Sequence, residues 1–239
     1  MERITKAVCR QPHPLILEIG PGQGALTALL LERAERVVAI EIDPAMVDHL
    51  KERFDEDPRL IIHQGDVLQT DLSQWGPAVL AGNLPYYITS PILERIFAAS
   101  HVLSQATILV QKEVAERMVA APGSRDYGLL SVRTQLHADA KLLFKVPPGS
   151  FTPPPKVDSA VVHLTLKPAA DHTEFLTFVG RCFSQKRKTL RNNLVPFFGK
   201  EKVDSQPESG LRAEQLGIAQ LMDLQQRLLS TFSTEQQQI

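Results

Sequence analysis

Four consecutive residues, Asn83-Leu84-Pro85-Tyr86, combine two acceptors, a rigid ring and an aromatic side chain directly after a short apolar run. The side-chain oxygen of Asn83 and the backbone carbonyl of Leu84 can accept hydrogen bonds, while Pro85 fixes its own φ and restricts its predecessor. Acceptors held in this way accept hydrogen bonds from the N–H groups of an exocyclic amine and make its nitrogen a better nucleophile. Tyr86 offers a face on which an unstacked base gains roughly 1–3 kcal/mol. An ordinary turn with half-buried tyrosines is the alternative, so the stretch indicates base chemistry only beside a nucleotide site.

A glycine-rich segment, EIGPGQG at residues 18–24, follows one predicted strand and begins a predicted helix. Gly20 and Gly22 allow the backbone to turn tightly and approach a ligand, and the helix N-terminus supplies unpaired N–H groups. With Ala25 the same glycines also fit the dinucleotide fingerprint, and a purely structural turn is a third explanation. The segment by itself therefore leaves the ligand open.

Two carboxylates follow the next two predicted strands. Glu41 lies 21 residues after Gly20, where a carboxylate can accept hydrogen bonds from both hydroxyls of a ribose. Asp66 follows the third strand and is placed to accept from an adenine amine. Either acid alone can instead cap the helix or turn that follows it. Together behind one glycine loop, they resemble the S-adenosylmethionine site of Rossmann-like methyltransferases.

These residues require a sheet that brings several strand ends to one edge. Near-continuous apolar runs predict strands at residues 15–19, 37–42, 60–63, 78–82 and 107–110, with helices at 25–33, 45–54 and 91–99. Strands of this kind separated by helices are typical of a parallel sheet covered on both faces, which binds ligands outside the carboxyl ends of its strands. A further helix is expected at 131–138 and two late strands at 142–146 and 161–166.

The pattern changes after Pro168 to helices alone, predicted at residues 174–183, 185–194 and 218–232. We therefore predict two domains. Residues 1–168 are expected to form an α/β domain, a Rossmann-like methyltransferase sheet with helices on both faces. Residues 169–239 are expected to form a small all-helical domain.

The composition excludes several classes of protein. A chain of 239 residues with 43% hydrophobic residues can bury a core, and its formal net charge of -1 identifies no partner. Cys9 and Cys182 are far apart and outside any CxxC pattern, so neither a disulfide framework nor a metal site is expected. The sequence contains no signal-peptide run and no stretch of about 18 apolar residues. We expect a cytoplasmic protein without a membrane partner.

The chain resembles the ribosomal RNA adenine dimethyltransferases, and among them the bacterial small-subunit (16S) enzyme. The matching segments are LEIGPGQGALT, VVAIEID, GDVL, GNLPYYITSPIL, LVQKEVAERMVA, YGLLSV, FTPPPKVDSAVVHL and FSQKRKTLRNNL, in family order from residue 15 to about 194. The resemblance implies N6,N6-dimethylation of two adjacent adenosines near the 3′ end of 16S rRNA within the immature small subunit. It implies S-adenosylmethionine as methyl donor and no metal, and we expect a monomer.

The same resemblance implies a set of site residues. Tyr86 would stack on the target base, and the cofactor would be bound by Gly20, Gly22, Glu41, Asp66 and Asn83. The chain departs from the family at two places. Tyr87 stands where the family usually has Asn, and no Gly-Gln-Asn-Phe-Leu-type segment, which closes over the cofactor, precedes Leu15. A truncated chain, a start assigned too late or a more open pocket would each explain the second departure, and activity of the sequence as given depends on which applies.

Two further segments are candidates for RNA contacts. Residues 181–202 contain seven basic residues against the single acid Glu201, and the predicted helix 185–194 concentrates them. A solvated helix face is the ordinary explanation, but an RNA substrate favours phosphate contacts from Lys186, Arg187, Lys188 and Arg191. The proline-rich segment 147–159 should form a stiff loop that either presents Phe151 and Lys156 beside the target pocket or only bridges two strands.

Three rival functions remain open from the sequence. The nearest is the large-subunit rRNA adenine methyltransferase that confers antibiotic resistance, which shares much of the motif set. The second is a non-catalytic assembly factor that binds the immature subunit. The third is a dinucleotide-dependent dehydrogenase, which leaves Asn83-Leu84-Pro85-Tyr86 unexplained.

Overall fold

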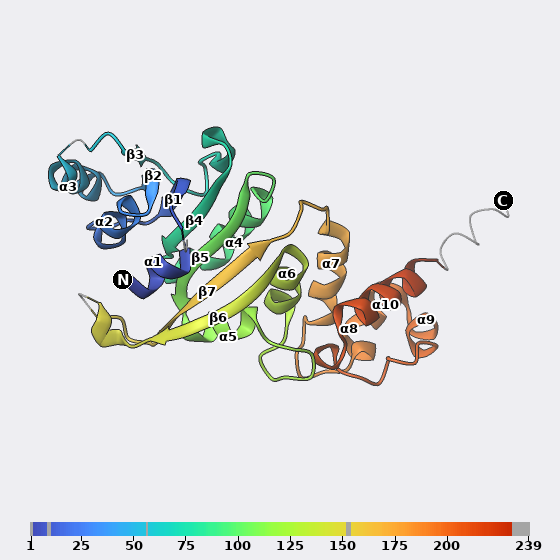
Figure 1. Cartoon of the computed structure of the whole chain (residues 1–239). Coiled ribbons are helices and arrows are strands. Elements are labelled where there is room, and N and C mark those ends of the chain that lie inside the picture. Colours follow the sequence, from blue (N-terminus) through green and yellow to red (C-terminus); the bar gives the residue numbers. More distant parts are fainter. Residues whose placement is uncertain (1, 9–10, 56, 152–153, 231–239) are drawn as a thin grey trace. The chain divides into compact units, whose positions relative to one another are not determined.

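The first part of the chain forms a seven-stranded sheet in the order β3-β2-β1-β4-β5-β7-β6 (Figure 1). The computed structural model describes residues 2–8, 11–55, 57–151 and 154–230, so Cys9 and residues 231–232 of the last predicted helix lie outside the described residues. The strands are β1 (His13–Ile19), β2 (Ala34–Glu41), β3 (Leu60–Gln64), β4 (Ala78–Asn83), β5 (Leu103–Gln111), β6 (Ala138–Val146) and β7 (Ser159–Leu166). The predicted α/β methyltransferase sheet is confirmed.

The first five strands are parallel, whereas β7 lies antiparallel between β5 and β6. The parallel arrangement expected of the first five strands is confirmed. Of the seven described strands only β7 runs in the opposite direction, and its antiparallel neighbour β6 precedes it along the chain. The reason is their connection: only the proline-rich segment and the short turn η3 (Pro148–Ser150) separate β6 from β7. A parallel pair would need a crossover connection, usually through a helix, whereas an antiparallel pair can return directly.

The helices described between residues 2 and 137 are α1 (Glu2–Val8), α2 (Ala25–Leu31), α3 (Pro44–Phe54), α4 (Thr89–Ala98), α5 (Lys112–Met118) and α6 (Leu129–His137). The sequence analysis missed α1 and α5. Strand order moves outward from β1 through β2 to β3, but in the opposite direction from β4 to β5. Because such crossovers are right-handed, α2 and α3 cover one face of the sheet and α4 the other (Figure 1).

The face under α1 and α2 holds an apolar core. Ile4 and Val8 of α1 and Leu30 of α2 pack in one cluster with buried side chains of the sheet such as Ile16 and Val161. Burying a side chain of this size stabilises the fold by roughly 1.5–3 kcal/mol. The apolar runs read as strands thus supply the core that fixes the strand ends.

Contacts divide the chain into two compact units with different bounds from the predicted domains. The first unit comprises residues 1–115 and 137–169, and the second comprises residues 116–136 and 170–239. Segment 116–136, which the sequence analysis placed in the first domain, belongs to the second unit. The reason is its apolar content, because Tyr127 and Val132 share a core with Phe178, Leu194 and other helical residues of the second unit.

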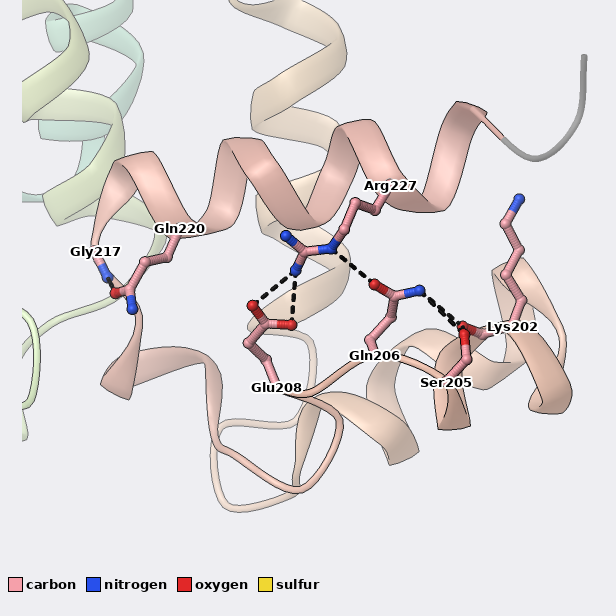
Figure 2. A network of polar contacts seen from close by, with 7 residues as sticks. All are labelled: Lys202, Ser205, Gln206, Glu208, Gly217, Gln220 and Arg227. Carbon is pink, nitrogen blue, oxygen red and sulfur yellow. Dashed lines mark hydrogen bonds and ion pairs between the residues drawn. The ribbon is translucent and has the colours of Figure 1, made fainter.

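The second unit contains α7 (Thr173–Cys182), α8 (Leu190–Phe198), α9 (Lys200–Asp204), η4 (Ala213–Gln215) and α10 (Ile218–Ser230). A polar network around Arg227 of α10 fixes the loop that follows α9 (Figure 2). Arg227 Nη2 donates to both oxygens of Glu208 at 2.7 Å, and its Nε donates to Gln206 Oε1 at 2.9 Å. In the described part of the chain, no helix combines the length and apolar character that crossing a membrane requires.

Candidate active site

The strand order brings the predicted site residues to one edge of the sheet. Strands β3, β2, β1 and β4 are parallel neighbours, so Asp66, Glu41, Gly20 and Asn83 follow one another along their carboxyl ends. The direction of strand succession reverses between β1 and β4, which is where open α/β sheets bind their ligands. The glycine loop and the Asn83 segment flank this point on its two sides.

The glycine loop adopts a backbone that only glycine adopts readily. Gly20, Gly22 and Gly24 have φ of 67°, 52° and 78°. A Cβ on Gly20 would also lie 3.2 Å from the carbonyl oxygen of Asn83, and a Cβ on Gly24 would lie 2.6 Å from the ring of Phe54. Apart from its chain neighbours, no atom of the described residues lies within 4 Å of a Cβ built on Gly22, so that part of the loop is open. The loop is therefore packed tightly at both ends and accessible in the middle.

Glu41 is a buried carboxylate that connects two loops. Its Oε2 accepts from the backbone N–H of Gly22 at 3.2 Å, and its Oε1 accepts from Ile42 and Asp43 at 2.9 and 3.0 Å. The interpretation that Glu41 caps the next helix is wrong, because Asp43 is the N-cap of α3 and accepts from Ala45 at 2.9 Å. Glu41 thus ties the glycine loop to the end of β2 and retains lone pairs for a further donor.

Asp66 forms a turn and retains one unused oxygen. Its Oδ1 accepts from the backbone N–H of Leu68 at 2.9 Å, so the turn-capping interpretation holds for that atom. Among the described residues, Oδ2 accepts no hydrogen bond. Ile42, next to Glu41, is 64% exposed although it is a large apolar residue. An exposed apolar side chain next to one carboxylate, with a second carboxylate after the neighbouring strand, suits a purine ring with its ribose.

The backbone of Leu84 and the side chain of Tyr86 are each held by a hydrogen bond to another strand of the sheet. The N–H of Leu84 donates to the carbonyl of Leu109 on β5 at 3.0 Å, and the Leu84 side chain is only 1% exposed. The hydroxyl of Tyr86, in η2 (Tyr86–Ile88), lies 2.6 Å from Ser159 Oγ at the start of β7. The Asn83 side chain is exposed and has no hydrogen-bond partner among the described residues. The acceptor is therefore available while its supports are fixed.

A pocket of about 220 Å³ is lined by Asn83, Leu84, Pro85, Tyr86, Phe151 and Pro155. The proline-rich segment thus contributes Phe151 to the same pocket as the acceptors, whereas Lys156 is exposed and does not line it. Tyr87 is 86% exposed, so it is not one of the half-buried tyrosines that an ordinary turn would contain.

Residues 1–228 match the family model described as ribosomal RNA adenine dimethylase. The chain belongs to this family. The resemblance inferred from the sequence motifs is confirmed, and with it the enzyme class, an rRNA adenine dimethyltransferase. A dinucleotide-dependent dehydrogenase is excluded.

Proteins named ribosomal RNA small subunit methyltransferase A are similar over most of their length. That of Acidobacterium capsulatum is 43% identical over 224 residues, which cover 87% of this chain and 79% of the relative. That of Pseudomonas syringae pv. tomato is 39% identical over 98% of this chain and 91% of its own. A dimethyladenosine transferase from Plasmodium falciparum has a similar crystal structure (TM-score 0.80, 26% identity), covering 97% of this chain and 94% of its own. The 23S rRNA methyltransferase ErmE matches with a TM-score of 0.68 and 27% identity over 95% of both chains.

The basic segment of this dimethylase differs from the predicted helix 185–194. Residues 183–188 form turns, and α8 begins only at Leu190. The reason is a loop distant in sequence: the carbonyls of Leu211 and Ser209 accept from the N–H groups of Leu190 and Arg191 at 2.7 and 2.9 Å. These bonds satisfy the helix start, which has no side-chain cap.

The four predicted RNA-binding cations of this segment differ in their surroundings. Arg187 and Lys188 are exposed, and Lys186 is exposed but donates to the carbonyl of Arg125. Arg191 is paired with Asp204, with contacts of 2.5 and 3.2 Å. Arg191 is therefore the weakest of the four candidates, because a phosphate would have to compete with a carboxylate that is already in place.

Glu18 is a buried acid that the sequence analysis quoted without assigning a role. It is 1% exposed and accepts from Thr27 Oγ1 at 2.7 Å. Burial, opposed by the Thr27 hydrogen bond and reinforced by the nearby Glu41, raises the pKa of Glu18 to about 7. The sequence gives no sign that Glu18 is buried, because an acidic residue just before a glycine loop is usually interpreted as a ligand contact.

Replacing Glu18 with Gln is expected to stabilise the protein more at pH 8 than at pH 5. A raised pKa means that the folded state binds more protons than the unfolded state, so the free energy of unfolding falls as pH rises from 4.5 to about 7. The Gln variant does not titrate and avoids a loss on the order of 3 kcal/mol. Urea unfolding at both pH values measures the difference, and Glu35→Gln at an exposed position is the control. An equal effect of Glu18→Gln at both pH values would contradict the raised pKa.

Proposed function

We propose that this dimethylase transfers methyl groups from S-adenosylmethionine to the N6 atoms of two adjacent adenosines near the 3′ end of 16S rRNA. The observation that carries the proposal is the Asn83 side chain, which has no hydrogen-bond partner within the described part of the chain and lines a pocket with Tyr86 and Phe151 beside the Gly20 loop. The small-subunit relatives support the choice of RNA. We propose further that the protein acts as a monomer on the immature subunit in the cytoplasm.

The residues at the sheet edge fit the cofactor. Glu41 would accept from the ribose hydroxyls with the lone pairs that its backbone contacts leave available. Asp66 Oδ2 would accept from the adenine amine, and the exposed Ile42 would pack against the adenine ring. Gly20 and Gly22 give the remainder of the molecule close access to the backbone. When bound, the cofactor supplies a methyl group already activated by its positive sulfur.

The Asn83 segment would prepare the target amine. Asn83 Oδ1 and the Leu84 carbonyl would accept hydrogen bonds from the two N6–H groups, which pulls the nitrogen lone pair out of conjugation with the ring and towards the methyl carbon. The bound cofactor would supply the methyl group to N6, and the proton that N6 then loses would leave to water. Tyr86, positioned by Ser159, and Phe151 would hold the extruded base, whose stacking offsets much of the few kcal/mol that extrusion costs.

A methylation assay on separate subunits tests the proposal. The protein is incubated with labelled S-adenosylmethionine and either immature small subunits or large subunits, and the label is mapped in the RNA. We expect label at adenine N6 in small-subunit RNA alone. Label confined to large-subunit RNA would replace the proposal by the second candidate, the large-subunit methyltransferase, which the likeness to ErmE favours. Subunit binding without any label would favour a non-catalytic assembly role.

Replacing Lys186, Arg187 and Lys188 with Ala is expected to weaken RNA binding and flatten its salt dependence. Each lost phosphate contact lowers the slope of log K against log salt by at most about 0.9. Because these cations would position the RNA and do not touch the base, the rate at saturating substrate should change little. Filter binding over a salt series measures the slope. Arg191→Ala serves as a comparison with a smaller expected effect. An unchanged slope in the triple variant would mean that the segment is an ordinary solvated surface.

A further inference from the structure

The turn that carries Asp66 is held by a side chain from a helix that follows later in the chain. Arg95 lies in the middle of α4, and its Nη2 donates to the carbonyl of Thr70 at 2.7 Å. Ile92 and Ile96 of the same helix are fully buried, which fixes α4 on the sheet. Because Arg95 extends from a fixed helix, it can hold the end of the Asp66 turn in one place.

Thr70 in turn fixes the backbone of Asp66. Its N–H and its Oγ1 both donate to the Asp66 carbonyl, at 2.9 and 2.8 Å, and Thr70 is buried. Just before Asp66, the N–H of Gly65 donates to the carbonyl of Glu41 on β2 at 2.9 Å. The backbone around Asp66 is therefore held on both sides, by β2 before it and, through Thr70, by Arg95 after it.

The guanidinium of Arg95 is oriented for this one acceptor. Its Nε is buried and has no hydrogen-bond partner among the described residues. A buried donor left in this way destabilises a fold, and such groups are rare in native proteins. The bond from Nη2 to the Thr70 carbonyl is the stronger kind, because its donor is charged. The position of the guanidinium thus serves the Thr70 carbonyl and not the saturation of its own donors.

We propose that Arg95 is a positioning residue for the adenine end of the cofactor, because by fixing Thr70 it directs Asp66 Oδ2 at the adenine amine. The inference rests on the proposed contact between Asp66 and that amine. Asp66 Oδ1 already accepts from the N–H of Leu68 at 2.9 Å, which fixes the rotation of the carboxylate. The direction of Oδ2 then depends on the backbone of the turn, which is the part that Arg95 holds.

The test compares two ligands by calorimetric titration without RNA. One is S-adenosylhomocysteine, and the other is S-inosylhomocysteine, in which an oxygen replaces the adenine amine. The parent should bind the first ligand more tightly. Arg95→Met keeps a long side chain without a donor. It should weaken S-adenosylhomocysteine binding about tenfold, the equivalent of one hydrogen bond, and leave S-inosylhomocysteine binding within about twofold. Arg36→Met, at an exposed position of β2, is the matched control and should bind both ligands as the parent does.

A second measurement separates positioning from a general contribution to the fold. In an Asp66→Ala background, Arg95→Met should cause no further loss of S-adenosylhomocysteine affinity, because the group that it positions is gone. Residues that act independently would instead give additive losses. The rate of methyl transfer at saturating cofactor should stay at the parental value, since Arg95 acts on cofactor affinity. If thermal melts show that Arg95→Met does not fold, Arg95→Gln, which removes the charge and shortens the donor, gives the same comparison.

Three results would overturn the inference: equal losses for the two ligands in Arg95→Met, parental affinity for both, or additive losses in the Asp66→Ala background. Equal affinity of the parent for the two ligands would remove the Asp66 contact from the proposed cofactor site, and the inference with it. The expected binding pattern combined with failure of the subunit methylation assay would overturn the proposed RNA substrate and leave the role of Arg95 in place.

Discussion

Replacing Asn83 with Ala is expected to lower the rate of methyl transfer by about 10²–10³-fold, the range seen when one preorganised polar partner is removed from a reacting group. The Asn83 side chain has no other partner among the described residues, so its loss should not disturb the fold. The Leu84 carbonyl remains fixed by the bond from its N–H to Leu109. One N6 proton would then lack an acceptor, and the amine lone pair would stay conjugated with the ring.

The measurement is a single-turnover assay at saturating RNA and S-adenosylmethionine, with RNA affinity determined in parallel. RNA affinity should stay within a few-fold of the parent, because a base contact of one acceptor is small beside the phosphate contacts. Asn192→Ala, an exposed asparagine on α8, is the matched control and should leave the rate unchanged. A parental rate in Asn83→Ala would remove the acceptor role from the mechanism.

Replacing Glu41 with Gln is expected to weaken S-adenosylmethionine binding by roughly 100-fold or more. In the parent both carboxylate oxygens accept backbone N–H groups, from Gly22 on one side and from Ile42 and Asp43 on the other. An amide has only one oxygen, so one side would face an NH₂ group and lose its acceptor. An unsatisfied donor together with a weakened ribose contact amounts to about 3 kcal/mol, which corresponds to that loss of affinity.

Calorimetric titration with S-adenosylmethionine measures this effect without RNA. Asp43→Asn is the control, because it removes one negative charge two residues away while its side-chain oxygen can still cap Ala45. Unchanged cofactor affinity in Glu41→Gln would mean that the carboxylate only braces the loops. A similar loss in both variants would mean that net charge, and not the hydrogen-bond pattern, determines the affinity.

Sequence reasoning located the first four strand ends because each combined an apolar run with a chemically distinct terminus, such as Glu41 or Asn83. Side-chain type and strand order were sufficient to place these residues at one edge. Their roles stay predictions, but their proximity no longer does. The hydrogen bond of Tyr86 could not be predicted from the sequence. Its hydroxyl partner Ser159 is 73 residues away, and no local pattern in either segment indicates the contact.

The helix predicted for the basic segment was wrong at its start for a similar reason. Residues 185–194 have a sequence that suits a helix, but the acceptors at Leu211 and Ser209 start the helix at Leu190 instead. Asn193 adds to this, since its side chain donates to the carbonyl of Cys182 at 2.7 Å and closes the preceding turn. Tertiary contacts of this kind override local propensity, and a single sequence does not reveal them.

The discontinuous second unit has a consequence for how the protein is made. Tyr127 leaves the ribosome well before Leu224 and Leu228, with which it shares a core in the finished protein. At about 5–20 residues per second, the roughly 100 residues between them take about 5–20 s to synthesise. For that time the newly made segment 116–136 has no core to enter and is a natural client for chaperones. A fragment expressed from residue 170 onward would lack segment 116–136 and its side chains in the shared core. The helical unit therefore cannot be produced alone by cutting the gene at one point.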